Sequence, residues 1–216
     1  MQTADDILTK LNLDQFFTES GFSYDLTAGT VKNGAARRII YVSTDLMRGI
    51  YQALLEETAE AWKIIFQNCG RTWGKRVAGT IDQELVGSGR ASQSELPIEG
   101  YVKFIEAYFQ QHGWGTLKID LSDAPSHGFV SATLENSYFA EVLHDVDDFV
   151  DSLLAGILQG FLEHVSGAQL GCTEIGCVRR GADVCTFVVT DQGRLDAIDH
   201  RVGESPVVQI LADLKS

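Results

Sequence analysis

Three of the four cysteines in this chain lie within 14 residues, in the segment CTEIGCVRRGADVCTF at 172–187. Cys177 and Cys185 flank a stretch whose glycine and aspartate favour a tight turn, so a hairpin there brings the two thiols together. Glu174 joins them if the strand bulges at Gly176. Two thiolates and a carboxylate suit Zn²⁺, a borderline-soft ion that prefers tetrahedral sulfur, nitrogen and oxygen ligands. The spacing Glu-x2-Cys-x7-Cys therefore predicts a metal clip, with reduced, buried, metal-free thiols as the alternative.

The composition and the N-terminus limit what these cysteines do. The segment MQTADDILTK has neither the basic nor the apolar region of an export signal, and no apolar run approaches the ~20 residues that a membrane span requires. We therefore expect a cytoplasmic protein, in which a structural disulfide is disfavoured. The sequence places no base beside the thiols, which argues against nucleophilic catalysis.

The charge of the chain limits its partners. The 216 residues carry a formal charge of −13, with an isoelectric point near 4.7. Such a surface repels phosphate backbones, so we expect no direct binding of nucleic acid. With 44% hydrophobic and 22% charged residues, the chain can build an ordinary globular core.

The first half of the chain predicts mainly helices. Residues 4–18 predict a short amphipathic helix, and RRIIYVS at 37–43 predicts a strand. A long helix is expected from about Thr44 to Asn68, because its apolar residues recur every three or four positions. They are Leu46, Ile50, Leu54, Trp62 and Ile65.

Glycines mark the expected end of that long helix. Gly70 and Gly74 predict that the helix breaks and restarts, and Cys69 beside them is expected to be a packed, inert thiol. The Gly- and Ser-rich stretch 87–97 predicts a loop or hinge. Residues 98–113 then predict a second helix with an aromatic face, formed by Tyr101, Phe104, Tyr108 and Phe109.

The remaining segments predict a sheet framed by helices. Residues 114–122 and 128–137 alternate as strands do and predict a hairpin. A helix is expected over 145–167, with aspartates in its first turn, Gly167 after its end, and a small-residue face at Gly156 and Gly160 for tight packing on the sheet. The cysteine hairpin follows, with arms at 168–177 and 184–190, and a closing helix over 204–216. This order predicts an α+β fold with an antiparallel sheet.

These features resemble a known family. A hairpin with a glutamate and two cysteines around a glycine turn, preceded by a helix with glycines, resembles the 4-vinyl reductase domain family over residues 130–190. More weakly, residues 37–80 resemble the sensory domain of phenol-responsive transcription activators. The matching residues of the stronger resemblance are Asp151, Gly156, Gly160, Glu174, Cys177, Gly181, Cys185 and Phe187.

The resemblance implies a single small-molecule-binding domain over 1–216, with a helical N-terminal half at 1–95 and a 4-vinyl reductase domain at 96–216. Its fold is similar to that of nitric-oxide sensors and palmitate-holding trafficking subunits. The resemblance also implies a homodimer, with a protein partner as a further expectation. Within the family, the chain is most similar to stand-alone cyanobacterial members associated with photosynthetic complexes.

The resemblance further implies a structural zinc ion. In the phenol-responsive relatives a helix cysteine, a glutamate and two hairpin cysteines hold zinc, and the last three correspond to Glu174, Cys177 and Cys185. The helix cysteine falls on Asp151, which is a departure that makes the site harder and less selective. Cys172 and His164 are alternative fourth ligands.

A ligand chamber is expected between the first long helix and the sheet. Its occupant is a hydrophobic molecule such as a tetrapyrrole, a lipid or an aromatic compound, bound without chemistry in the assembly or regulation of photosynthetic complexes. The expected lining is aromatic and comprises Trp62, Phe66, Trp73, Phe104, Tyr108, Trp114, Tyr138 and Phe139, with His112 at the mouth.

The alternative is an enzyme that reduces the 8-vinyl group of a chlorophyll precursor. Hydride transfer requires a donor cofactor. The sequence has no G-x-G-x-x-G after a strand, and GSGRAS at 87–92 lies in a polar loop. The sequence therefore favours a binding protein over a reductase.

Overall fold

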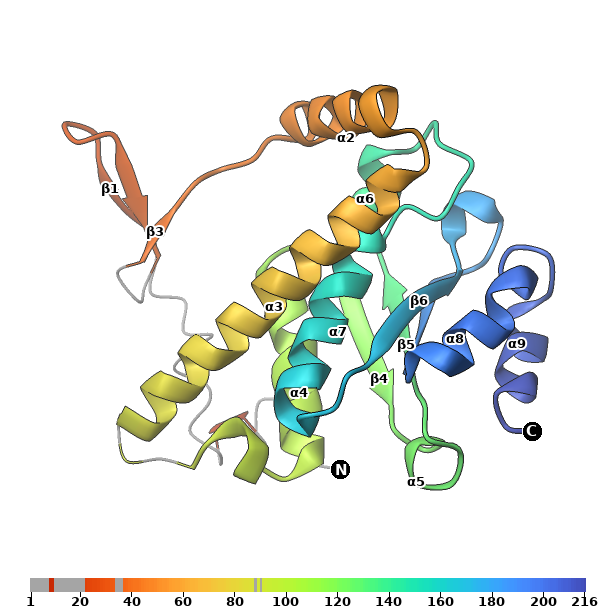
Figure 1. Cartoon of the computed structure of the whole chain (residues 1–216). Coiled ribbons are helices and arrows are strands. Elements are labelled where there is room, and N and C mark those ends of the chain that lie inside the picture. The colour runs from red at the N-terminus through yellow and green to blue at the C-terminus, as the bar shows by residue number, and fades with distance from the viewer. Residues whose placement is uncertain (1–7, 10–21, 34–36, 88, 90) are drawn as a thin grey trace.

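The computed structural model describes residues 8–9, 22–33, 37–87, 89 and 91–216, which form helices packed against an antiparallel sheet (Figure 1). This confirms the predicted α+β class. In chain order the elements are β1 (Ser23–Asp25), β2 (Thr30–Lys32), β3 (Arg38–Ile39), α2 (Thr44–Thr58), α3 (Ala61–Gly87), η2 (Gln93–Glu95), α4 (Ile98–Gln111), β4 (Thr116–Asp120), α5 (Ala124–His127), β5 (Val130–Glu135), α6 (Tyr138–Val142), α7 (Ser152–Ser166), β6 (Gly171–Gly176), η3 (Val178–Arg180), β7 (Cys185–Thr190), α8 (Gln192–Ile198), η4 (Asp199–Arg201) and α9 (Val207–Asp213).

The main sheet joins the two predicted hairpins. Its order is β4-β5-β7-β6, and every neighbouring pair is antiparallel. The β4–β5 pairing runs from Thr116 opposite Glu135 to Asp120 opposite Ser131. Pairing of β5 with β7 then places the cysteine hairpin beside the first one, although α6 and α7 separate the two hairpins in sequence.

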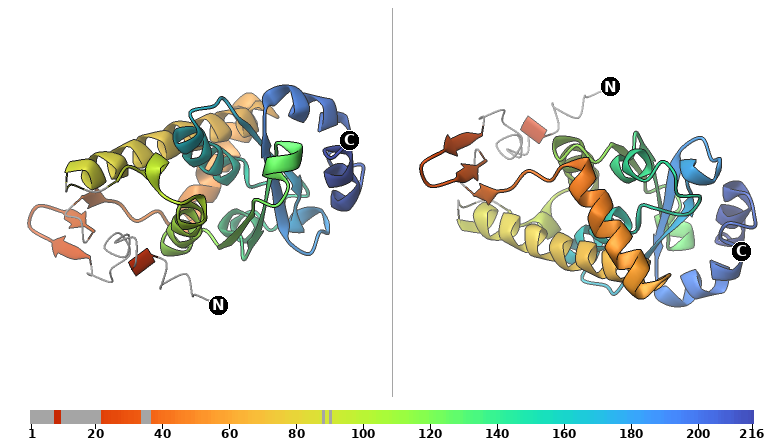
Figure 2. Two further views of the ribbon diagram at one scale, coloured as in Figure 1. Left: turned by 90° about the horizontal axis from the view of Figure 1, so that it is seen from below. Right: turned by 90° about the horizontal axis from the view of Figure 1, so that it is seen from above.

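Each face of the sheet has its own apolar core, because successive side chains of a strand point to opposite faces. Cys185, Phe187 and Val189 of β7 contribute to the larger core, which also contains buried residues of α3, α4 and α7. Val188 belongs to a smaller core that α8 and α9 cover on the other side (Figure 2). The helix predicted at 204–216 is thus confirmed as α9, whereas sequence analysis missed α8.

The predicted break at Gly70 and Gly74 is wrong, because α3 runs unbroken through both glycines. The interruption lies instead at Ala59, which has a φ of 47° between α2 and α3. The glycines allow α3 to contact α7 at backbone distance, since a Cβ added at Gly70 would lie 2.1 Å from the Leu153 carbonyl oxygen. Glycine at these positions therefore permits close helix packing.

The small-residue face of α7 makes the reciprocal contact. A Cβ at Gly156 would lie 2.1 Å from the Gln67 carbonyl oxygen, and one at Gly160 would lie 2.5 Å from that of Arg71. The prediction that this face packs on the sheet is therefore wrong, because it packs on α3, alongside α7 in Figure 1. Four interleaved glycines hold the two helices together.

Several other boundaries also differ from prediction. The strand expected over 37–43 is reduced to Arg38–Ile39. The helix expected over 145–167 begins only at Ser152, so the aspartates expected in its first turn precede it, while Gly167 ends it as predicted with a φ of 66°. Cys69 is exposed rather than packed, because the buried face of α3 passes through Gly70 instead. The helix predicted over 4–18 lies outside the described residues, apart from 8–9.

The α3–α7 contact also contains a buried ion-pair network that the sequence analysis missed. The Glu163 side chain is fully buried and accepts hydrogen bonds from Arg71 Nε at 2.7 Å and Leu170 N at 3.0 Å. Lys75 Nζ lies 2.7 Å from the same carboxylate. Burial raises the pKa of Glu163, but the hydrogen bonds from Arg71 and Lys75 outweigh it and lower that pKa to about 2.

No helix within the described part of the chain combines the length and apolar character of a membrane span.

The glycine contact predicts opposite effects of alanine at two helical sites. We expect Gly156→Ala to lower the free energy of unfolding by about 2 kcal/mol or more, because the new methyl group meets backbone that cannot yield cheaply. Gly49→Ala in α2 is the matched control, since a Cβ there has no atom within 4 Å, and it should stabilise by about 0.5–1 kcal/mol. Urea unfolding of both variants measures the difference. Equal effects would contradict the packing role of Gly156.

The Glu163 network predicts a pH-dependent contribution to stability. Because the folded pKa lies below the usual value near 4.3, the contribution is complete above about pH 4.3 and is lost as the pH falls toward 2. We expect Glu163→Gln to cost about 2 kcal/mol at pH 7 and progressively less below about pH 4. Urea titrations across this range, with the exposed Glu57→Gln as control, measure it. A gap that does not change with pH would contradict the prediction.

Candidate functional site

The bulged cysteine hairpin is confirmed in the structure. Glu174 pairs with Phe187 and Gly176 pairs with Thr186, so the register shifts by one residue between them. One step further along the arms, Cys177 lies opposite Cys185. The tip closes through η3 and Gly181, whose φ of 85° favours glycine.

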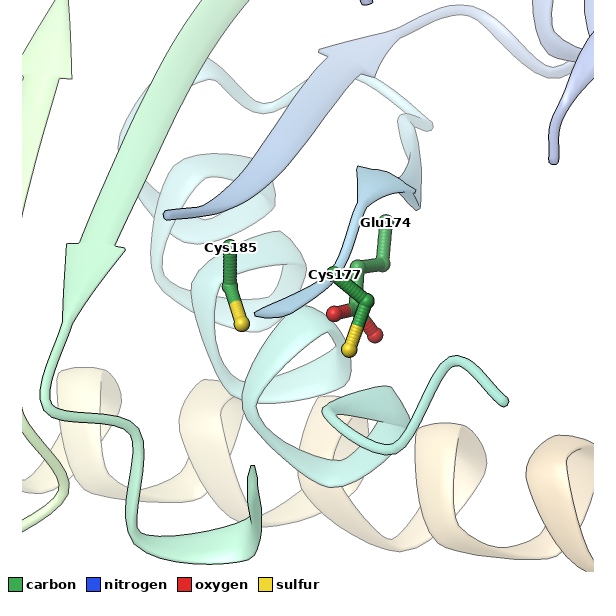
Figure 3. A group of neighbouring side chains, drawn as sticks. All are labelled: Glu174, Cys177 and Cys185. Atoms are coloured by element: carbon green, nitrogen blue, oxygen red, sulfur yellow. The ribbon is translucent and has the colours of Figure 1, made fainter. Parts of the chain in front are cut away.

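The hairpin brings three candidate ligands together. The ligand atoms of Glu174, Cys177 and Cys185 all lie within 4.8 Å of one another, and Figure 3 shows the three side chains converging. All three residues are buried. The bulge is what allows this, because in a regular strand positions 174 and 177 would point to opposite faces.

Asp151 reaches the same cluster from the start of α7. An aspartate in the N-cap position usually accepts a hydrogen bond from the first turn of its helix, but the Asp151 side chain makes no such bond. It accepts one from Ser137 Oγ at 2.5 Å and another from the Cys185 thiol. Its backbone N–H donates to Glu174 Oε2 at 2.9 Å. Sequence analysis did not identify Ser137.

The cluster concentrates acidic groups where water is excluded. Burial raises the pKa of Asp151 to about 6 and raises that of Glu174 well above its usual value, where the charges of Asp151 and Cys177 add to the effect. Hydrogen bonds from Cys185, Glu174 and backbone N–H groups lower the pKa of Cys177 to about 6 against the effect of burial. Sharing that proton raises the pKa of Cys185.

Two carboxylate oxygens in the cluster have no partner. Asp151 Oδ2 and Glu174 Oε1 are both buried without a hydrogen bond. Buried polar atoms are nearly always paired, so each indicates a missing interaction. A divalent cation bound here would pair with such oxygens and favour the deprotonated form of both thiols. The donor set of two sulfurs and two carboxylates therefore fits a borderline-soft metal ion.

The two alternative ligands lie outside this group. His164 is near the other end of α7, where its Nε2 lies 2.6 Å from Asp82 Oδ2. Cys172 is buried in the larger core on the same strand as Glu174, and its thiol is not among the ligand atoms that converge. Burial, together with the charge of Glu174, raises the pKa of Cys172.

The eight aromatic residues expected to line a chamber fall into two groups. An inner ring cluster connects Trp62 to Phe66 at 5.7 Å between centroids and Phe66 to Phe139 at 6.3 Å. Tyr138 continues it at 5.4 Å from Phe139. Trp62, Phe66 and Phe139 are nearly inaccessible to solvent, so they form part of the core.

The outer ring cluster consists of Trp73, Tyr108, His112 and Trp114, where α3, the end of α4 and the segment before β4 meet. Trp73 lies 5.3 Å from Trp114, and His112 stacks on Tyr108 at 4.2 Å. Phe104 and Phe161 support Tyr108 from the core side. His112 is exposed, and the other three are partly exposed. Burial lowers the pKa of His112, which favours the neutral imidazole.

Two open pockets flank the hairpin tip, away from both ring clusters. One of about 450 Å³ is lined partly by Glu135, Glu141 and Asp183. The other, of about 590 Å³, lies between the hairpin and the start of α9 and includes Cys177 and Phe149. None of the eight aromatic side chains lines either pocket.

Comparison with protein families identifies the segment that contains the hairpin. Residues 130–191, from β5 to the start of α8, match the model of the 4-vinyl reductase (V-4-R) domain. This segment is a 4-vinyl reductase domain. The predicted resemblance is thereby confirmed, and all eight residues on which it rested lie within the matched range. A comparison with curated proteins gives no significant match.

Solved structures extend the similarity beyond the 4-vinyl reductase domain. The phenol-responsive sensory domain of the transcription activator PoxR, in complex with phenol, is 17% identical, with a TM-score of 0.65 over 95% of this chain and 100% of that one. A vinyl-4-reductase family protein from Methanocaldococcus jannaschii is 19% identical, with a TM-score of 0.47 over 88% of this chain and 96% of its own. At such identities, the PoxR similarity establishes a shared fold.

A third solved structure is more distant. It is a trafficking protein particle complex subunit 3 from Naegleria fowleri, covalently bound to palmitic acid. It is 16% identical, with a TM-score of 0.47 over 68% of this chain and 93% of its own.

Several contacts around the 4-vinyl reductase domain were missed because they join distant segments. Gln67 of α3 donates to the Cys172 carbonyl oxygen at 2.7 Å, and Gln159 of α7 donates to that of Leu170 at 2.6 Å. Together with Ser137 and Glu163, these residues fix β6 against the two helices. Polar residues in otherwise apolar helices are the available sequence signal, but they do not identify their partners.

Proposed function

We propose that this chain is a non-catalytic receptor domain for a small hydrophobic molecule, with a structural zinc ion next to its ligand site. The outer ring cluster is the observation that carries the ligand site, because its aromatic side chains are packed together yet partly accessible. Aromatic surfaces of this kind bind planar or apolar ligands by stacking and burial. The PoxR sensory domain, whose structure contains phenol, supports the same class of ligand.

The proposed zinc ion is held by Asp151, Glu174, Cys177 and Cys185. The two unpaired carboxylate oxygens and the two thiols support this donor set. Four protein ligands leave no open position, so zinc at this site supplies cross-linking and no catalysis. Its effect is to tie both arms of the hairpin to the start of α7.

The proposal includes finer expectations about the setting. The thiols stay reduced in the cytoplasm, and the ligand is a tetrapyrrole, a lipid or an aromatic compound. The protein acts with a protein partner in the assembly or regulation of photosynthetic complexes. Incubation with a divinyl tetrapyrrole, with and without NADPH, separates binding from the alternative vinyl reductase activity. A shifted absorption spectrum without product supports the binder, and NADPH-dependent loss of the vinyl group supports the enzyme.

Metal removal tests the proposed zinc clip. We expect about one zinc ion per purified chain by elemental mass spectrometry, and loss of that zinc in Cys177→Ser and Cys185→Ser. Removing one ligand costs about 3 kcal/mol, which lowers the melting temperature by roughly 6–12 °C.

Two matched variants sharpen the metal experiment. Cys69→Ser changes the exposed cysteine and should retain both zinc and wild-type melting. Asp151→Cys provides three thiolates and should raise zinc affinity. Zinc-free wild-type protein, together with unchanged melting in Cys177→Ser and Cys185→Ser, would contradict the clip.

Aromatic probes test the proposed ligand site. We expect phenol and 1-naphthol to quench tryptophan fluorescence, and Trp73→Ala or Trp114→Ala to weaken binding by roughly tenfold or more, because each ring contributes about 1.4 kcal/mol or more of contact. Calorimetric titration gives the affinities, with Tyr41→Ala in an exposed aromatic residue of the N-terminal strands as control. Binding that depends instead on Phe149→Ala would relocate the ligand to the larger pocket at the hairpin tip.

A further inference from the structure

Exposed apolar side chains are concentrated in one part of this molecule. In the described part of the chain, fourteen large apolar side chains are strongly exposed. Nine of them lie within residues 22–55, whereas isolated exposed residues occur elsewhere. These nine are Phe22, Tyr24, Leu26, Ile40, Tyr41, Val42, Leu46, Ile50 and Leu55.

Six of the nine lie in a small β-structure that stands apart from the main body. We call residues 22–43 the arm, which comprises β1, β2, β3 and the extended segment after them. Figure 1 shows the arm beside the far end of α3, and both views in Figure 2 place it at the end of the molecule opposite α9. None of its described apolar residues belongs to either hydrophobic core.

The arm presents an ordered apolar surface in spite of this exposure. Tyr24 stacks on Tyr41 with 6.4 Å between ring centroids, and their hydroxyl groups are hydrogen-bonded. Phe22 packs edge-on against Tyr41 at 6.0 Å. Leu26 and Ile40 are 89% and 77% exposed. A sheet with strands of two or three residues and no packed face has little stability of its own, so this surface requires cover.

Charge distinguishes the arm from the rest of the chain. Residues 22–43 carry three basic and one acidic residue, whereas residues 44–216 carry 13 basic and 25 acidic residues. The arm is thus a basic, apolar segment attached to an acidic body. Within one chain its recorded ion pair to the body is Arg37 with Glu84. Its charge is complementary to the surface of another copy.

We propose that the arm docks on α2 of a second copy of this chain, and that the second arm does the same in return. Helix α2 presents the other three exposed side chains, Leu46, Ile50 and Leu55. Its residues 44–58 include one basic and three acidic residues, opposite in sign to the arm. Such a reciprocal contact has the closed two-fold symmetry of most homodimers. Nine side chains of this kind expose on the order of the ~800 Å² that each partner buries in an ordinary interface.

Sedimentation equilibrium tests the dimer. Wild-type protein should have twice the chain mass of 23.7 kDa. The double variant Leu26→Asp/Ile40→Asp should dissociate, with the dimer Kd raised at least tenfold, because each change places an unpaired charge in an apolar contact. Ile64→Asp is the control, since Ile64 is also exposed but lies on α3, and it should remain dimeric. Monomeric wild-type protein, or equal dissociation of the control, overturns the proposal.

Zero-length cross-linking tests where the arm docks. Carbodiimide joins a lysine to a carboxylate in direct contact, and mixing ¹⁴N- with ¹⁵N-labelled protein distinguishes links between chains from links within one. Lys32 of the arm should form mixed-isotope links to Glu56 or Glu57 of α2. Only same-isotope links from Lys32 would overturn this arrangement. Because the double variant keeps the outer ring cluster, it should bind 1-naphthol normally, so this proposal and the ligand proposal can fail separately.

Discussion

The close approach of α3 and α7 is the constraint on which the rest of the structure depends. Gly70, Gly74, Gly156 and Gly160 leave no room for a side chain between the two backbones. Because α7 begins at the buried cluster, its contact with α3 also fixes the position of Asp151. The same contact holds Glu163 against Arg71 and Lys75. Packing between helices therefore determines where the acidic groups of the hairpin meet.

The hairpin could be predicted from the sequence because its signals are local. A glycine turn, a bulge at Gly176 and two flanking cysteines lie within a few residues, and the register confirms each of them. The family match over residues 130–191 rests on the same short segment. The closing helix at 207–213 and the hairpin of β4 with β5 were also predictable from local pattern.

The errors arose where one residue type serves two purposes. A glycine in a helix predicts either a break or a close contact, and only the partner helix decides, which is why Gly70 and Gly74 were misinterpreted. The aspartate run before α7 is typical of a helix start, yet the Asp151 side chain is used by Ser137 and Cys185 instead of capping its helix. Cys69 followed from apolar composition alone, without knowledge of which face of α3 is covered. Long-range partners were absent from the sequence pattern in each case.

The bulge at Gly176 has a consequence for how this hairpin tolerates changes in length. It restores the side-chain parity of β6, so that positions on either side of it face α7 in spite of an odd spacing. Loss of one residue between 174 and 177 would turn the Cys177 thiol toward α8 and α9, where Val188 and Ile210 pack. Beyond Cys177 the tip makes no such demand. Insertions are therefore compatible with this architecture at 178–184 and incompatible two residues earlier.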